Sequence, residues 1–192
     1  MFMARYIRPT IGLLIVMTVL LGVIYPLVIT LAATAVFPKQ AAGSLIYSGG
    51  TLAGSKLIGQ NFSDPKYFWS RPSATSPQPY NGLSSGGSNL GPLNPALIDK
   101  VAANAKLLQG ADPSNNRPIP VDLVTASASG LDPDISPAAA EYQAMRVARI
   151  RKLPLEKVES LVAQHTRGPF LGLIGEPAIN VLELNLALDQ MH

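Results

Sequence analysis

The sequence predicts a single N-terminal transmembrane helix followed by one α+β extracytoplasmic domain, which has a small β-hairpin or sheet, a long ordered loop and several helices. Three observations lead to this prediction. No charged side chain occurs from Pro9 to Pro38. Proline and glycine are concentrated in residues 38–135, and helix-capping patterns recur from Asn94 onward. The chain therefore combines a membrane anchor with a domain whose first half is rich in loops.

The N-terminal apolar run is long enough to cross a bilayer. Most positions between Ile11 and Phe37 are Ile, Leu, Val or Ala, and about 20 such residues span the hydrocarbon core. Pro26 removes one backbone hydrogen bond and is expected to kink the helix without ending it. Three threonines can return their hydroxyl groups to the helix backbone: Thr18, Thr30 and Thr34.

The flanking charges predict the orientation of the anchor. Arg5 and Arg8 precede the run, whereas Lys39 is the one basic residue close behind it, and Lys and Arg mark the cytoplasmic side. The alternative is a cleaved signal that releases a secreted binding protein after Ala35. We favour a retained anchor, because signal h-regions run to only about 7–15 residues. The expected divisions are a cytoplasmic N-terminus at 1–9, a transmembrane helix at 10–36 and an extracytoplasmic domain at 38–192.

Composition limits what the domain can bind. The chain has 15 Lys and Arg against 12 Asp and Glu, and two of the basic residues precede the anchor. The domain is thus nearly neutral, which argues against nucleic acid as a partner. There is no cysteine, so disulfides, thiolate metal sites and cysteine nucleophiles are excluded.

The first half of the domain is predicted as a hairpin and an ordered loop. Ser44–Tyr47 and Leu52–Ile58 are expected strands around a Gly49-Gly50 turn. Residues 59–93 show no periodicity but hold many aromatic residues, including Trp69, the one tryptophan. Because such residues do not persist in disordered linkers, this loop is expected to be packed.

The second half is predicted to be mostly helical. One helix is capped by Asn94 and ends near Gly110, and residues 121–126 are expected to form a short buried strand. A tail helix begins after Asn180, although alternating leucines also fit a strand. The two central helices run from Ser136 to about Lys152 and from Pro154 to about Arg167.

The candidates for acid–base or metal chemistry are weak. His165 lies on the apolar side of its helix and is expected to be a core or capping residue. His192 ends the sequence, where fraying is the default. Asp132 and Asp134, around Pro133, are interpreted as a turn into the next helix, because calcium needs more oxygen ligands. We expect no metal site.

Two further clusters have simpler interpretations than a binding site. Ser85, Gly86, Gly87, Ser88 and Asn89 could bring backbone amides to a nucleotide phosphate. No Walker pattern or nearby lysine supports this, so a tight turn is the simpler interpretation. The basic cluster on the central helix is expected to be a solvated face: Arg146, Arg149, Arg151 and Lys152. No motif indicates an enzyme.

Six segments of the chain, taken together, carry a resemblance to one family: 54–62, 67–74, 85–92, 122–133, 172–177 and 180–189. The family that they resemble is the C subunit of the bacterial Kdp potassium-transporting ATPase. The match runs in order from the anchor to the C-terminus, with Pro169-Phe170 as a departure where the family more often has a polar or basic residue.

The resemblance implies a non-catalytic accessory subunit of an ATP-driven, high-affinity potassium uptake complex in the plasma (inner) membrane of a bacterium. Its partners would be a channel-like potassium subunit, a P-type ATPase subunit and a small fourth subunit, and ATP and K⁺ would be handled by those partners. The subunit would support assembly and act as a catalytic chaperone of ATP binding. Because the predicted topology places the Gly-Gly loop outside, that effect would have to pass through the assembled subunits.

The resemblance and the residue types together predict two contact regions. Gly12 and Gly22 would let the anchor approach partner helices closely. The aromatic loop would dock on a partner over the potassium entrance through Trp69, Arg71 and Tyr80, because aromatic residues and arginine dominate interface cores.

Overall fold

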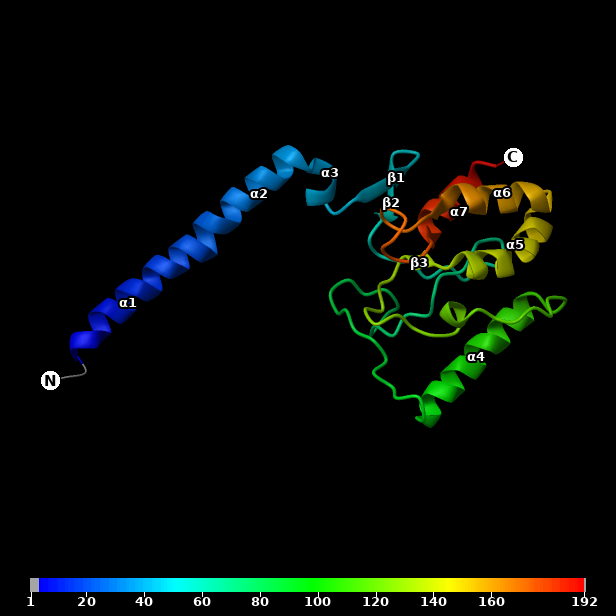
Figure 1. Ribbon diagram of the computed structural model, residues 1–192, viewed down its shortest axis with the longest axis horizontal. Helices are drawn as coiled ribbons and strands as arrows, with labels where there is room; N and C mark the ends of the chain where they lie inside the picture. The colour runs from blue at the N-terminus through cyan, green and yellow to red at the C-terminus, as the bar shows by residue number, and fades with distance from the viewer. Residues whose placement is uncertain (1–3, 192) are drawn as a thin grey trace. The chain divides into compact units, whose positions relative to one another are not determined.

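A computed structural model describes residues 4–191. The chain divides into two compact units, with the boundary after Leu45. The first contains the apolar helix and the second is the C-terminal domain (Figure 1).

The N-terminal unit is a long helix with an exposed apolar surface. It consists of α1 (Ala4–Val19), a π-helical turn (Leu20–Ile24) and α2 (Tyr25–Val36). Arg5–Val36 covers 32 residues with a mean hydropathy of 2.6 in its most apolar window, and that window is not buried. It is the one helix among the described residues that is long and apolar enough to cross a membrane. A short helix, α3 (Pro38–Ala41), follows.

The helix continues through Pro26 by widening one turn. A proline ring collides with the carbonyl of the residue four positions earlier, which here is Gly22. The π-helical turn lies just before Pro26, and the Tyr25 N–H donates to the Leu20 carbonyl, five residues back. The Thr34 hydroxyl donates to the Thr30 carbonyl at 2.8 Å, as the sequence predicts.

The predicted hairpin begins the C-terminal part of the chain. Strands β1 (Leu45–Ser48) and β2 (Thr51–Ser55) pair with each other. Gly49 and Gly50 adopt φ values of 56° and 82°, the left-handed conformation that tight hairpin turns require. The second strand is shorter than predicted and ends at Ser55.

The described part of the C-terminal domain contains four α-helices: α4 (Pro95–Ala111), α5 (Pro137–Arg151), α6 (Leu155–His165) and α7 (Val181–Asp189). Three begin at predicted caps. The side chains of Asn94, Ser136 and Asn180 accept hydrogen bonds from the N–H groups of the first turn. The helical interpretation of the tail is therefore confirmed.

A small antiparallel sheet joins these helices. It contains β3 (Asp134–Ile135), β4 (Thr166–Arg167) and β5 (Ala178–Asn180) in the order β3-β5-β4, and Ile179 lies opposite both Ile135 and Thr166. The helix expected to reach about Arg167 therefore ends at His165, because the next two residues pair with β5.

The prediction of a short strand at residues 121–126 is wrong. Val121–Leu123 forms a 3₁₀ turn, and the Thr125 N–H and hydroxyl both bond the Val121 carbonyl. The Asp122 carboxylate accepts from the Ser136 N–H at 2.8 Å. Leu123 and Val124 are buried as expected. Burial was thus predicted correctly for these two residues but not for Val121, which is 70% exposed, and local hydrogen bonds favoured a turn.

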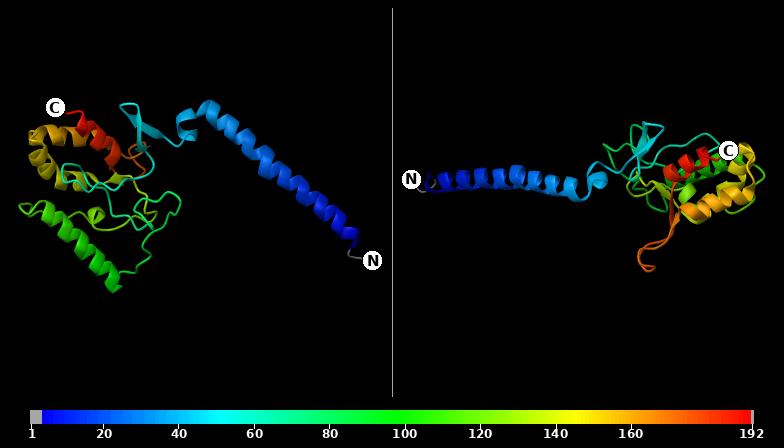
Figure 2. Two further views of the ribbon diagram at one scale, coloured as in Figure 1. Left: turned by 180° about the vertical axis from the view of Figure 1, so that it is seen from behind. Right: turned by 90° about the horizontal axis from the view of Figure 1, so that it is seen from above.

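The core lies among α5, α6, α7 and β5, which contact one another (Figure 2). Phe68, from the irregular loop, is fully buried within it, so the prediction that this loop is packed is confirmed. The aliphatic and small residues in this core include Ile135, Ala139, Ala140, Ala144, Val147, Val158, Val162, Ile179, Leu184 and Leu188.

Candidate functional site

The loop around Phe68 is held to α7 by one buried amide. The Asn185 Oδ1 accepts from the Phe68 N–H at 2.9 Å, and the Asn185 Nδ2 donates to the Phe68 carbonyl at 2.9 Å. One side chain thus satisfies both backbone groups of a residue 117 positions away. Irregular backbone can be buried only when its polar groups are paired, and Asn185 meets that need.

Gln143 on α5 repeats this arrangement one residue further along the loop. Its Oε1 accepts from the Trp69 N–H at 2.8 Å, and its Nε2 donates to the Trp69 carbonyl at 3.1 Å. The Trp69 ring is partly buried, and its Nε1–H donates to the Asp64 carbonyl. Two side-chain amides from two helices therefore align two consecutive loop residues.

Arg146 on α5 is a third side chain that holds this loop. Its guanidinium lies 4.7 Å from the centre of the Trp69 ring and donates to the carbonyls of Pro65 and Tyr67 and to Gln143 Oε1. Burial lowers the pKa of Arg146 to about 10. We call Gln143, Arg146 and Asn185 the polar clamp.

The prediction of a solvated basic face is wrong for Arg146, which is only 2 % exposed. Arg149 pairs with Asp112 at 2.8 Å, and Arg151 pairs with Asp189 at 2.6 Å. The helical spacing of the sequence could have indicated that Arg146 is buried. Gln143 and Arg146 occupy the same face of α5 as Ala139 and Val147, which are buried.

Arg71 and Tyr80 also bond within the domain. Arg71 Nη1 lies 3.0 Å from Asp132 Oδ2, and the Tyr80 hydroxyl donates to the Arg71 carbonyl. Burial raises the pKa of Tyr80 to about 12. An added Cβ on Gly59 would lie 2.3 Å from the Tyr80 ring, so the close approach there requires glycine. Contact of Trp69, Arg71 or Tyr80 with a partner stays a prediction.

The two glycines predicted for helix packing lie on the exposed surface of the apolar helix. A Cβ built on Gly12 would meet no described atom within 4 Å, and one on Gly22 would meet only Thr18 Cγ2, at 3.9 Å. The space above each glycine is therefore open to another helix, as close approach requires.

The Gly-Gly loop packs against another segment of the same domain. The Gly86 N–H donates to the Ser129 carbonyl at 2.9 Å, and Ser85 Oγ donates to the same carbonyl at 3.0 Å. A Cβ on Gly87 would lie 2.8 Å from the Ala128 carbonyl oxygen. The Gly86 amide that a phosphate would need is thus already used, which argues against a nucleotide site at Ser85, Gly86, Gly87, Ser88 and Asn89. The prediction of a tight turn at these residues is wrong as well, because the segment contains no turn and bonds instead to Ser129.

The weak metal and acid–base candidates have local partners. His165 Nδ1 lies 2.9 Å from the Leu161 carbonyl, which agrees with a core or capping role. Asp132 faces Arg71, and Asp134 faces Arg167 at 2.5 Å. His192 lies outside the described residues. Within residues 4–191, no group of three or more His, Cys, Asp or Glu side chains could hold a metal ion.

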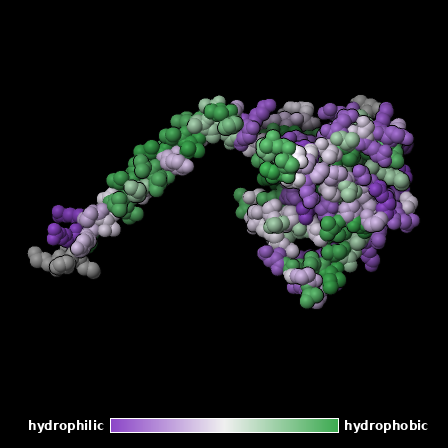
Figure 3. Space-filling model, viewed as in Figure 1, coloured by the Kyte–Doolittle hydropathy of each residue, from purple (hydrophilic) through white to green (hydrophobic). Residues whose placement is uncertain are grey.

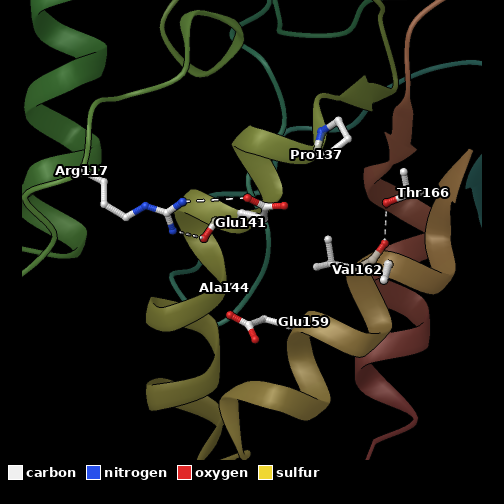
Figure 4. Close-up of a pocket in the computed structure, with 8 residues that line it drawn as sticks. Arg117, Pro137, Glu141, Ala144, Glu159, Val162 and Thr166 are labelled. Atoms are coloured by element: carbon white, nitrogen blue, oxygen red, sulfur yellow. Dashed lines mark hydrogen bonds and ion pairs between the residues drawn. The ribbon is translucent and has the colours of Figure 1, made fainter. Parts of the chain in front are cut away.

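A groove of about 590 Å³ lies between α5 and α6 (Figure 4). Arg117 donates to the Glu141 carbonyl at 3.1 Å and lies 3.9 Å from its carboxylate. Glu159 belongs to the opposite helix, and the Thr166 hydroxyl donates to the Val162 carbonyl. The polar groups are mostly paired with their own neighbours, so the groove presents no convergent ligand set.

Comparison with known proteins covers almost the whole chain. Residues 7–190 match the family described as "KdpC: K+-transporting ATPase, c chain". The chain belongs to the KdpC family. This match includes nearly all of the apolar helix and the C-terminal domain, so both units are parts of the family's architecture.

Similar proteins occur in several bacteria, each named "Potassium-transporting ATPase KdpC subunit". The protein of Variovorax paradoxus is 64% identical over 97% of both chains. That of Polaromonas naphthalenivorans is 63% identical over 98% of this chain and 96% of its own. That of Herpetosiphon aurantiacus is 58% identical over 98% of each chain. The resemblance inferred from the sequence segments is therefore confirmed.

Proposed function

We propose that this KdpC-family chain is a non-catalytic accessory subunit of an ATP-driven potassium uptake complex. The observation that carries the proposal is the family match over residues 7–190. The internal bonding of the C-terminal domain supports it, because the polar side chains that sequence reasoning singled out mostly stabilise the fold. The partners would be a channel-like potassium subunit, a P-type ATPase subunit and a small fourth subunit.

The proposed topology has the N-terminus in the cytoplasm and the C-terminal domain outside. Arg5 and Arg8 before the span support this orientation. The family match covers the apolar helix from residue 7 onward, which supports a retained anchor over release after Ala35. Labelling a Ser88→Cys variant in intact cells with an impermeant thiol reagent tests the topology. Reaction supports an outside loop, and protection contradicts it.

The complex itself is tested by co-purification. The full chain is tagged, membranes are extracted with mild detergent, and the recovered proteins are identified. Recovery of a P-type ATPase and a channel-like subunit, with potassium-stimulated ATP hydrolysis, is the expected result. Recovery of the chain without them, under conditions that preserve other membrane complexes, would overturn the proposal.

We further propose that the subunit raises the ATP affinity of the ATPase subunit through coupling across the assembled complex. A domain on the opposite side of the membrane from ATP cannot touch it, so the effect must be a coupling free energy, typically about 1–3 kcal/mol. The measurement is the apparent affinity for ATP with and without this chain in the complex. Equal affinities would contradict the coupling.

The proposed docking role of the aromatic loop needs a matched comparison, because Arg71 also pairs with Asp132. Arg71→Ala and Asp132→Asn both remove this ion pair, but only Arg71→Ala removes a side chain expected to contact a partner. We expect Arg71→Ala to lower complex yield on pull-down several-fold more than Asp132→Asn. Equal yields would mean that Arg71 acts within the domain.

A further inference from the structure

One exposed apolar element has no role in the domain's own core. Residues 168–175 form a small hairpin in which Phe170 bridges to Ile174. Figure 2 shows this segment, in orange, extending from the body of the domain, and Figure 3 shows a hydrophobic patch over it. The four apolar side chains at its tip are 66–88% exposed: Phe170, Leu171, Leu173 and Ile174. Exposed apolar groups gathered in this way mark a docking surface.

The backbone of this hairpin is largely bonded to itself. The Ile174 N–H donates to the Phe170 carbonyl at 3.0 Å, and the Phe170 N–H donates to the Ile174 carbonyl at 2.8 Å. The N–H groups of Gly172 and Leu173 also donate within the hairpin. Backbone that enters lipid must satisfy its polar groups internally, because no water is available there. The hairpin meets this requirement for four of its amides.

The side chains of the hairpin favour lipid over protein as the occupant. From Gly168 to Gly175 the sequence contains no charged residue and no side chain that can form a hydrogen bond. Protein interfaces usually surround their apolar centre with a polar rim and about one hydrogen bond per 100–200 Å². The two charged residues that flank this segment, Arg167 and Glu176, lie outside the hairpin, and Arg167 is paired with Asp134. The tip itself therefore offers no polar rim, whereas the bilayer interface accepts apolar and aromatic side chains without specific polar partners.

The bilayer is also within reach of the domain. The span ends at Val36 and β1 begins at Leu45. The residues between them, 37–44, can cover no more than about 28 Å even when fully extended. The anchor therefore keeps the domain close to the membrane surface, where even a weak second contact is populated because it is intramolecular.

From these observations we propose that hairpin 168–175 inserts its apolar tip into the interface of the bilayer that anchors the chain. This contact would be reversible and would restrain the orientation of the C-terminal domain relative to the membrane. It rests on the membrane anchor in the proposed function, but it does not depend on the potassium complex.

The test uses the full chain in lipid vesicles without partner subunits. Because the sequence lacks cysteine, Leu173→Cys provides a single site for an environment-sensitive fluorophore. We expect blue-shifted emission, quenching by lipids with nitroxides on their acyl chains, and several-fold lower quenching by aqueous iodide. Leu83→Cys is the control, since Leu83 is 99% exposed in a different loop of the same domain. Its label should remain in water.

A second variant tests whether the apolar side chains drive insertion. In a chain labelled at Leu171→Cys, adding Leu173→Asp should lower the lipid-quenched fraction on the order of tenfold, because a buried leucine is replaced by a charge. Adding Leu83→Asp should leave that fraction unchanged. Equal effects of the two substitutions would overturn the proposal.

Three other results would also overturn it. A label at residue 173 that iodide quenches as well as the one at residue 83 would show an aqueous tip. A blue shift that grows with the protein-to-lipid ratio, without quenching by lipid, would indicate a second copy of the chain. A blue shift seen only in the purified complex would indicate a protein partner.

Discussion

Two irregular regions of the C-terminal domain differ in how they are held. Both the loop 59–93 and the hairpin 168–175 are rich in glycine, proline and apolar side chains. The polar clamp bonds the first region to α5 and α7 and places Phe68 in the core. The second region bonds mainly to itself and exposes its apolar tip. An irregular segment therefore joins a core only when other elements supply partners for its backbone groups.

Removing the clamp residue on α7 should have the largest effect. Asn185→Ala leaves the buried N–H and carbonyl of Phe68 unpaired, and each such group costs about 1–3 kcal/mol. We expect the free energy of unfolding to fall by about 3–5 kcal/mol. This free energy is measured by urea unfolding of the full chain in detergent, with Trp69 fluorescence as the signal.

The control for Asn185→Ala is Gln164→Ala. Gln164 is also an amide on a helix, but it is exposed and bonds only the Ser160 hydroxyl among its described partners. Its loss should change the free energy of unfolding by no more than about 0.5 kcal/mol. If the two substitutions had similar effects, the clamp would not be what holds the loop.

A pair of glycine substitutions compares the two regions directly. Gly130 and Gly172 have φ values of +68° and +74°, so alanine is strained at both, at about 1 kcal/mol. A Cβ on Gly130 would also lie 2.6 Å from the Gly86 carbonyl, whereas one on Gly172 would meet no described atom within 4 Å. We expect the free energy of unfolding to fall by about 3 kcal/mol for Gly130→Ala and by about 1 kcal/mol for Gly172→Ala. Equal losses in urea unfolding would contradict close packing of the loop on residues 127–130.

The pH dependence of stability should report on Tyr80. Its pKa is raised by burial from 10.0 to about 12, so above pH 10 its phenol ionises first in the unfolded chain. The free energy of unfolding should then fall by up to about 1.4 kcal/mol per pH unit between pH 10 and 12. Burial also raises the pKa of Tyr142, so the difference from Tyr80→Phe isolates this contribution. If the free energy of unfolding had the same pH dependence in the unchanged chain and in Tyr80→Phe, Tyr80 would make no such contribution.

The smallest effect is expected in the hairpin. Leu173 is 88% exposed, so Leu173→Ser should change the free energy of unfolding in detergent by less than about 0.5 kcal/mol. Leu83→Ser serves as the matched substitution. A loss above 1 kcal/mol for Leu173→Ser would mean that the hairpin contributes to the core and is not a free docking element.

Local signals explain why much of the fold could be predicted. The uncharged run before Pro38, the paired glycines at 49–50 and the caps Asn94, Ser136 and Asn180 act through neighbouring atoms. The helices and the turn that these residues specify therefore depend little on distant parts of the chain. The sequence could not indicate the turn at Val121–Leu123, because the composition of this segment fits a short strand as well as a short turn.

The candidate site was harder to predict, because its contacts join distant residues. Gln143 meets Trp69 across 74 positions, and Asn185 meets Phe68 across 117. The sequence identified the aromatic loop as ordered, but it did not reveal that buried amides and Arg146 hold it. Nor did composition distinguish Arg146 from Arg149, although only the former is buried.

The sequence by itself determined the apolar helix, the capped helices of the C-terminal domain and, through its ordered segments, membership of the KdpC family. Only the tertiary structure decided which polar side chains are buried and which apolar segment remains exposed. The physical reason is that helix caps and membrane spans depend on neighbouring residues and on the solvent. Burial of a polar group depends instead on partners that folding brings together from distant positions.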